Sequence, residues 1–174
     1  QKGGKLLVTG LSSTNDETGK PLKRIRLKSL GVLPDYDLFP QTKSTYLRIS
    51  QADKQTLGTD GFKDLDLLMM YSDLLQCQPG SSAKALLRLV PNTRFGPPEK
   101  SYFTDADITN APGLIANSFG QGKTVFIPWR LGTQYEFKGH HGHRALFTAA
   151  LQSILQTSRS LQTDASSLIE MTHM

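Results

Sequence analysis

The sequence is poor in cysteine and has no long apolar run. One cysteine in 174 residues excludes an intramolecular disulfide and a zinc site built from cysteines. The longest apolar run, residues 67–71, is far too short to cross a bilayer, so no membrane span is expected. An initiator methionine and a signal-peptide pattern are also missing, so we expect Gln1 to be a cut end of a longer protein.

Length and charge point to one soluble-type domain with a real core. The net charge is +5, and much of it lies within residues 20–28. Lys20, Arg24 and Lys28 are four residues apart, which predicts a helix from Pro21 to Gly31 with one charged stripe. Because no aromatic residues interleave with these charges to stack on bases, we interpret the stripe as a solvated face and expect no nucleic-acid partner.

Several short apolar segments predict strands. The first, within residues 3–10, is bounded by glycines and is typical of a parallel sheet, whose carboxyl edge is a common ligand site. Further strands are predicted at residues 44–50, 65–71, 73–79 and 83–90, with a turn at 79–82. Residues 32–43 and 92–111 have no apolar period and are expected to be loops.

Residues 112–155 predict a hairpin followed by a helix. The strands are expected at 114–118 and 124–127, with turn chemistry at 119–123. The helix is expected to bury one face against the sheet, because apolar residues recur at helical spacing: Leu146, Phe147, Ala150, Leu151, Ile154 and Leu155. A hairpin covered by a helix indicates an α/β layered fold.

A loop between this hairpin and helix carries the residues that we select as ligand or interface candidates. These are Trp129, Arg130, Tyr135, Phe137, His140, His141 and His143. Its aromatic rings could stack on a sugar or pack over the core. Adjacent histidines at a helix start point in divergent directions, so capping or a partner contact is favoured, and neither a metal ion nor a cofactor is expected.

Three sequence patterns resemble parts of known nucleotide-binding or catalytic sites, but each lacks residues that such a site requires. Gly122-Lys123-Thr124 resembles the end of a phosphate-binding loop, but Asn117 stands where that loop needs glycine, and a strand follows instead of a helix. We therefore interpret Gly120 and Gly122 as turn residues with positive backbone φ.

The single thiol and the paired carboxylates lack a catalytic setting. Cys77 has no glycine elbow and no His-x-Glu partner, so a partly buried structural thiol is predicted. Glycosidases use two carboxylates, and the available pairs are Asp64 with Asp66 and Asp105 with Asp107. Both pairs stand at a strand edge or in a loop, where aspartate is a common turn residue.

The order of these pieces resembles a known family. GGKLLVTG, TYLRIS, AKALLRLV, a loop with PPE, and APGLIANSFGQGKTVFIPW look like the middle of the beta-galactosidase trimerisation domain. The resemblance covers most of residues 3–156. It implies an α/β, flavodoxin-like (class I glutamine amidotransferase-like) layered sheet with helices, here with an added β-hairpin segment. That family usually has a further strand and helix before the glycine pair, so an open strand edge is expected around residues 6–8.

The resemblance also implies a function for the chain. It implies that residues 1–156 form an N-terminally truncated accessory domain, and that 157–174 are a linker and the first strand of a following β domain. Such a domain would be non-catalytic and would pack against the upstream catalytic barrel of a glycoside hydrolase or mediate homo-oligomerisation. By family analogy, a periplasmic or secreted location is favoured. Two alternatives stay open: a carbohydrate-binding module using residues 129–143, and a metal-dependent hydrolase using the histidines.

Overall fold

The computed structural model describes residues 3–41, 45–58, 61–92 and 96–155. Its centre is a six-stranded sheet in the order β1-β8-β7-β6-β3-β4. The strands are β1 Lys5–Thr9, β3 Tyr46–Arg48, β4 Leu67–Met69, β6 Lys84–Val90, β7 Pro112–Phe119 and β8 Gly122–Ile127. β1 pairs with β8 in parallel, and the other neighbours pair in the antiparallel direction. The fold is therefore mixed α/β, and the strands predicted at these positions are confirmed.

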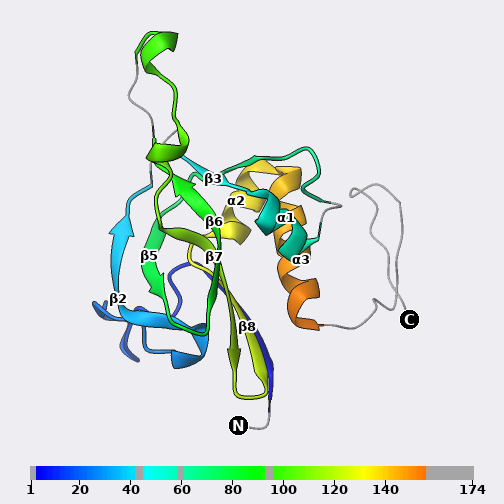
Figure 1. Ribbon diagram of the computed structural model, residues 1–174. Coiled ribbons are helices and arrows are strands. Elements are labelled where there is room, and N and C mark those ends of the chain that lie inside the picture. Colours follow the sequence, from blue (N-terminus) through cyan, green and yellow to red (C-terminus); the bar gives the residue numbers. More distant parts are fainter. Residues whose placement is uncertain (1–2, 42–44, 59–60, 93–95, 156–174) are drawn as a thin grey trace.

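Different elements cover the two faces of this sheet (Figure 1). The helices α1 Gln51–Leu57, α2 Leu131–Lys138 and α3 His141–Leu155 lie over one face, which we call the helical face. Over the other face, the ribbon face, lie the short helix η1 Lys28–Leu30 and a two-stranded antiparallel sheet of β2 Val32–Phe39 and β5 Leu74–Pro79. Within the described residues, no helix combines the length and the apolar content that a bilayer span requires.

The hairpin strands divide their apolar side chains between the two faces, because successive residues of a strand point in opposite directions. Leu114 and Val125 belong to the core of the helical face, together with Leu146 and Trp129. The next residues along, Ile115 and Phe126, belong to a smaller core on the ribbon face, which also holds Val8, Ile25, Leu30, Leu75 and Cys77. Both strands are consequently buried on both sides, as their continuous apolar sequences indicate.

The predicted positive φ is confirmed for Gly120 and is wrong for Gly122, which is the first residue of β8. Gly120 has a φ of 61°, which favours glycine. Gly122 has a different reason to be glycine: a Cβ there would lie 2.9 Å from the carbonyl oxygen of Gly4. That close approach lets the amide of Lys123 donate to the same carbonyl at 2.9 Å, where β1 begins to pair with β8.

Helix α3 has a narrower buried face than its sequence predicts. Leu146, Ala150 and Ile154 are buried against the sheet. Leu151 is only half-buried, and Phe147 and Leu155 are 45% and 42% exposed. The prediction that Phe147 and Leu155 join the buried face is therefore wrong, since the sheet contacts one stripe of the helix.

The predicted helix at residues 21–31 does not form, and this prediction is wrong. Its backbone is extended up to the short η1 turn, and Ile25 donates its amide to the carbonyl of Pro34 at 2.7 Å. The hydroxyl of Tyr36 donates to the carbonyl of Leu22 at 2.7 Å. These partners belong to β2, which occupies residues that we expected to be a loop. The basic side chains line an extended segment, not a helix.

The segment between hairpin and helix also differs from its prediction. Residues 131–138 are helix α2, where a loop was expected. Only Leu131 and Gln134 of α2 are buried, so the sequence offers no apolar stripe, and the helix ends at Gly139 with a φ of 57°. The predicted loop before β7 is confirmed over its described part: it projects from the sheet with the short helices η2 Pro98–Lys100 and η3 Asp105–Asp107 (Figure 1). The predictions for residues 157–174 lie outside the described residues.

Candidate functional site

The carboxyl ends of the parallel strands β1 and β8 meet at one edge of the sheet, where open α/β sheets often bind ligands. The amide of Gly10 donates to the carbonyls of Ile127 and Trp129, at 3.0 and 2.9 Å, and so joins the two strand ends. Gly10 has a φ of 72°, and a Cβ there would lie 3.7 Å from Cγ of Arg130. This junction places Arg130 at the edge, beside the loop that follows β1.

Arg130 is an exposed cation at this edge. Its Nη2 lies 3.8 Å from Oδ2 of Asp73, with 53% and 29% of the two side chains exposed. The amide of Arg130 donates to Oγ of Ser72 at 3.2 Å, and Oδ1 of Asp73 accepts from the amide of Gln41 at 3.0 Å. Sequence reasoning missed Ser72 and Asp73. A polar pair in the turn after a buried strand was the signal that could have indicated them.

Trp129 belongs to the core and not to the surface. Its side chain is fully buried, and its Nε1 donates to the carbonyl of Gly113 at 2.9 Å. The ring also meets the ring of His143 edge-on, with 5.8 Å between centroids. Stacking of this indole on a sugar would require the core to open.

His143 lies in the first turn of α3 and is fully buried. Its Nε2 lies 2.7 Å from the carbonyl oxygen of Met69. Because a carbonyl only accepts, Nε2 carries the proton, and the buried Nδ1 has no hydrogen-bond partner within the described residues. Burial lowers the pKa of His143 and keeps the ring neutral, although the bond to Met69 opposes this shift.

His140 and His141 stack at the start of α3, with ring centroids 4.7 Å apart. Nδ1 of His140 accepts from the amide of Gly142 at 3.1 Å, so this ring satisfies a free amide of the helix start. Burial lowers the pKa of His140, and the neighbouring His141 adds to this effect. In the part of the chain that the structure describes, no three His, Cys, Asp or Glu side chains are placed to hold a metal ion.

Tyr135 and Phe137 lie on α2, with exposed fractions of 41% and 73%. Residues two apart on a helix do not share a face, so these rings do not form one platform. Gln134 connects α2 to the segment that follows β4, since its Oε1 accepts from the amide of Tyr71 at 2.8 Å. Nζ of Lys138 lies 5.6 Å from the centre of the Tyr71 ring.

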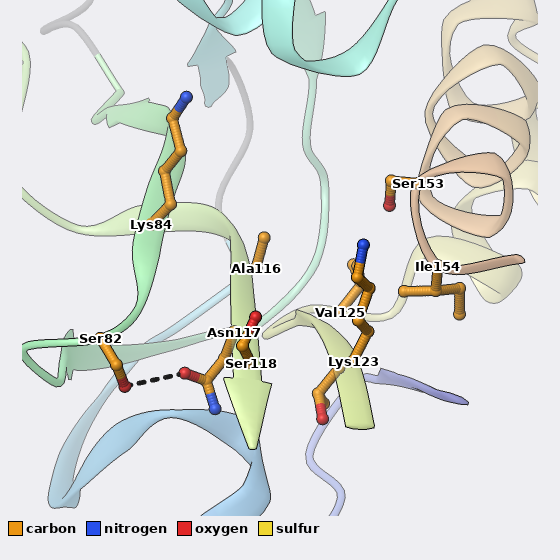
Figure 2. Close-up of a pocket in the computed structure, with 10 residues that line it drawn as sticks. Ser82, Lys84, Ala116, Asn117, Ser118, Lys123, Val125, Ser153 and Ile154 are labelled. Atoms are coloured by element: carbon orange, nitrogen blue, oxygen red, sulfur yellow. Dashed lines mark hydrogen bonds between the residues drawn. The ribbon is translucent and has the colours of Figure 1, made fainter. Parts of the chain in front are cut away.

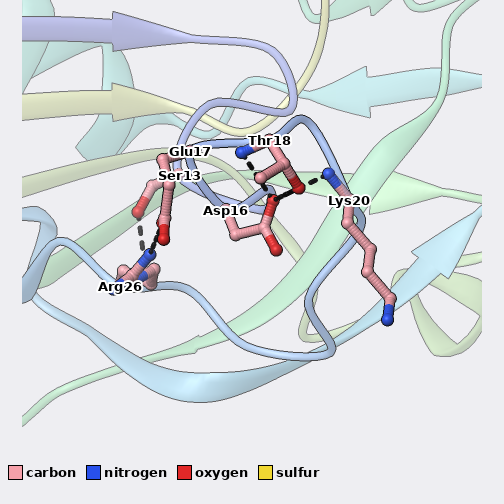
Figure 3. Close-up of polar contacts among 6 residues, drawn as sticks. All are labelled: Ser13, Asp16, Glu17, Thr18, Lys20 and Arg26. Atoms are coloured by element: carbon pink, nitrogen blue, oxygen red, sulfur yellow. Dashed lines mark hydrogen bonds and ion pairs between the residues drawn. The ribbon is translucent and has the colours of Figure 1, made fainter.

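In the loop after β1, polar side chains form hydrogen bonds and an ion pair with other residues of the same segment (Figure 3). Oδ1 of Asp16 accepts from the amide and hydroxyl of Thr18, at 2.9 and 2.7 Å, and from the amide of Lys20 at 2.9 Å. The hydrogen bond from the Thr18 hydroxyl contributes most to the lowered pKa of Asp16. Arg26 approaches Glu17 at 3.4 Å, with both side chains largely exposed. These contacts are all within the chain, and they order the loop.

Cys77, Asp66 and Asp107, which the sequence offered as possible catalytic groups, have structural roles. Burial raises the pKa of the Cys77 thiol to about 12, so this thiol is not a nucleophile at neutral pH. The hydrogen bond from Lys54, at 2.8 Å, lowers the pKa of Asp66, and hydrogen bonds from Thr104 lower the pKa of Asp107. A glycosidase general acid requires a raised pKa, so neither carboxyl is prepared for that role.

The described fold is similar to parts of known glycoside hydrolases. No family model and no curated protein sequence matches this chain. Among solved structures, alpha-L-fucosidase isoenzyme 2 from Paenibacillus thiaminolyticus is similar at 25% identity and a TM-score of 0.58, over 87% of this chain and 21% of the enzyme chain. The cold-adapted beta-galactosidase from Rahnella sp. R3 is similar at 17% identity and a TM-score of 0.54, over 96% and 21%.

A third similar structure does not carry the name of a hydrolase. It is a cytoplasmic protein from Salmonella typhimurium, with 19% identity and a TM-score of 0.57 over 87% of this chain and 55% of that one. This chain thus spans about a fifth of the length of the two enzymes that it resembles. The similarity fits a domain associated with glycoside hydrolases.

Proposed function

We propose that this chain is a non-catalytic accessory domain of a glycoside hydrolase and packs against a catalytic domain of the same protein. The observation that carries the proposal is the match of 87% of this chain to 21% of the fucosidase chain. The chemistry of the chain supports it, because the Cys77 thiol is protonated at neutral pH and Asp66 and Asp107 are held by hydrogen bonds.

In this proposal, residues 1–156 are a variant of the flavodoxin-like trimerisation domain, and 157–174 connect it to a following β domain. Support comes from the parallel pairing of β1 with β8 and from the helices that cover one face of the sheet. We extend the proposal to a periplasmic or secreted location, which rests on family analogy and is tested by fractionating the source cells.

Antibodies against this chain test the proposal. They should detect a much longer polypeptide in the source cells and should deplete glycosidase activity, assayed with nitrophenyl glycosides, from the extract. The recombinant chain alone should not hydrolyse these substrates. An endogenous polypeptide no longer than this chain, or turnover by the chain alone, would overturn the proposal.

An oligomeric role belongs to the same proposal. β1 is an outer strand of the sheet, and Leu6 on it is 38% exposed. Such an edge can pair with a strand of a second copy. Light scattering should then show association that Leu6→Lys weakens and Leu33→Lys leaves unchanged, since Leu33 is exposed on β2, away from this edge. Leu7 packs against the core and is unsuited to this test. A monomer at all concentrations would remove the oligomeric role only.

Carbohydrate binding at residues 129–143 is a second candidate, favoured by the exposure of Phe137 and Tyr135. Aromatic rings that stand free on a surface commonly stack on sugars or pack on a partner. Calorimetry against a panel of neutral oligosaccharides should detect binding that Phe137→Ala abolishes. Absence of heat with every oligosaccharide would remove this candidate.

A further inference from the structure

A hollow of about 270 Å³ lies on the helical face, between β6, β7, β8 and the last turns of α3 (Figure 2). It lies where β8 begins, at the opposite end of this strand from Arg130. Its floor is apolar and includes Ala116, Val125 and Ile154. Its rim is polar, and Lys84 and Lys123 stand on either side of Ala116 (Figure 2).

The sheet register brings three lysines to this end of the helical face. Lys84 pairs with Ala116 across β6 and β7, and Ala116 pairs with Val125 across β7 and β8. Lys123 lies two residues before Val125, and so shares its face, and it pairs with Lys5 of β1. Paired residues on neighbouring strands project to the same side of a sheet, so all three lysine side chains project from the helical face.

The three lysines have different partners. Nζ of Lys5 donates to the carbonyl of Leu155 at the end of α3, where a helix carries partial negative charge. Nζ of Lys84 donates to the hydroxyl of Thr56 at 2.7 Å. Lys123 makes no side-chain hydrogen bond or ion pair with any described residue, and none of the three meets a described carboxylate. Because neither Lys84 nor Lys123 has a carboxylate partner among the described residues, both leave uncompensated positive charge beside the hollow.

The hydroxyl groups of the rim complement these cations. Oγ of Ser153 donates to the carbonyl of Ala150 at 2.7 Å, which leaves its lone pairs free to accept a hydrogen bond. Ser118 is exposed and pairs with Lys123 across the hairpin. The hollow therefore offers charged donors, a hydroxyl acceptor and an apolar floor within one small volume.

We propose that this hollow binds a small molecule in which an oxyanion group, a carboxylate, sulfate or phosphate ester, is attached to a hydroxylated carbon skeleton. Lys123 and Lys84 hold the oxyanion, since lysine binds such groups as a mobile point charge. Ser153 accepts from a hydroxyl, and the skeleton lies on Val125 and Ile154. The volume of about 270 Å³ is slightly below the range of drug-sized sites, so the hollow has room for one small molecule or for one residue of a larger one. This inference is independent of the accessory role proposed above.

Titration of the ¹⁵N-labelled chain, followed by amide NMR shifts, tests the proposal. The probes are glucose 6-phosphate, glucuronate, sodium sulfate and glucose at constant ionic strength. The two charged sugars should give saturable shifts at Ala116, Ser118, Val125 and Ser153, and glucose should give none. Lys123→Ala should weaken binding by about tenfold, the effect of one charge-assisted hydrogen bond. Lys123→Arg should restore most of the affinity.

Lys20→Ala is the matched control, because it removes one exposed charge from the loop after β1. It should leave the affinity unchanged. Equal weakening by Lys20→Ala and Lys123→Ala, saturable binding of glucose, or no saturable shift with any charged probe would each overturn the proposal. Sulfate that binds as tightly as glucose 6-phosphate would overturn the contacts proposed for the carbon skeleton, and tighter binding of the sugar ester would support them.

Discussion

The two faces of the central sheet are covered in different ways. On the helical face, three helices bury large apolar side chains, among them Trp129, Phe62 and Leu146, against the strands. On the ribbon face, a smaller apolar cluster lies under β2, β5 and η1. Hydrogen bonds from polar side chains hold this second cover in place. The cover of the helical face is thus held mainly by the packing of apolar side chains, and the cover of the ribbon face by specific hydrogen bonds.

Asn117 shows how the ribbon face works. It is 7% exposed, its Nδ2 donates to the carbonyl of Ser29 at 3.0 Å, and its Oδ1 accepts from the hydroxyl of Ser82 at 3.0 Å. Gly31 ends η1 beside it with a φ of 71°, and a Cβ there would lie 2.3 Å from Cγ of Asn117. Substitutions on this face should therefore cost hydrogen-bond energies, and those on the helical face should cost cavity energies.

Trp129→Ala should give the largest loss. It removes a fully buried indole from the helical face and leaves the carbonyl of Gly113 without its donor. We expect the free energy of unfolding to fall by about 3–5 kcal/mol, measured by urea denaturation. Phe137→Ala, at an exposed ring, is the control and should change it little. A loss below that of Asn117→Ala would contradict the difference between the faces.

Asn117→Ala should give the next largest loss. It leaves the carbonyl of Ser29 unsatisfied and frees η1 from the sheet, so we expect a loss of about 1–3 kcal/mol by urea denaturation. Amide exchange should quicken in η1 and β2 more than in α3. Asn110→Ala, at an exposed asparagine, is the control. Uniformly faster exchange across the whole sheet would show that the ribbon face does not open separately.

Acid should weaken the helical face through His143. Burial holds the pKa of this ring below its usual 6.5, so the folded protein keeps it neutral while the unfolded chain binds a proton as the pH falls. The contribution is complete above about pH 6.5 and is lost as the pH falls through the lowered folded value. His143→Gln should flatten this part of the curve of unfolding free energy against pH. An unchanged curve would assign the acid sensitivity to other groups, of which His140 is the first to test.

Lys123→Ala should have the smallest effect on stability. Its amino group makes no hydrogen bond or ion pair with the described residues, and surface substitutions of this kind usually stay within about 0.5 kcal/mol. Thermal unfolding measures this directly. A larger loss would mean that the side chain stabilises the fold and would complicate its use in binding tests.

The sequence predictions succeeded where an element is determined by residues close in sequence, and they failed where it depends on residues far apart in sequence. The hairpin and α3 were predictable, because turn glycines and the spacing of Leu146, Ala150 and Ile154 are local signals. The spacing of the basic residues in 20–28 matched that of a helix, so a helix was predicted there. The hydrogen-bond partners of Ile25 and Leu22 lie in β2, and no local sequence pattern indicates this pairing. Helix α2 was missed because tertiary contacts, such as that of Gln134 with Tyr71, hold it without an apolar stripe.

The residues of the candidate site could be selected from the sequence, but their burial and their partners could not. The sequence selected Trp129 and the histidines as a group, and the structure does bring Trp129, His140 and His143 into ring contact. It could not indicate that Trp129 and His143 point inward, since burial depends on where α2 and α3 lie on the sheet. The partner of Arg130 was equally hidden, because Asp73 reaches it from a turn on a different part of the chain.

The parallel pairing of β1 with β8 has a consequence for how the molecule forms. These strands lie near opposite ends of the described chain, from Lys5 beside Lys123 to Thr9 beside Ile127. The hairpin of β7 and β8 closes a short loop and can form quickly, whereas β1 must wait until that hairpin exists. During synthesis on the ribosome, β1 emerges well before β8 and stays unpaired until β8 has followed. This early strand is thus among the last of the sheet to pair, and during that interval the nascent chain is exposed to mispairing.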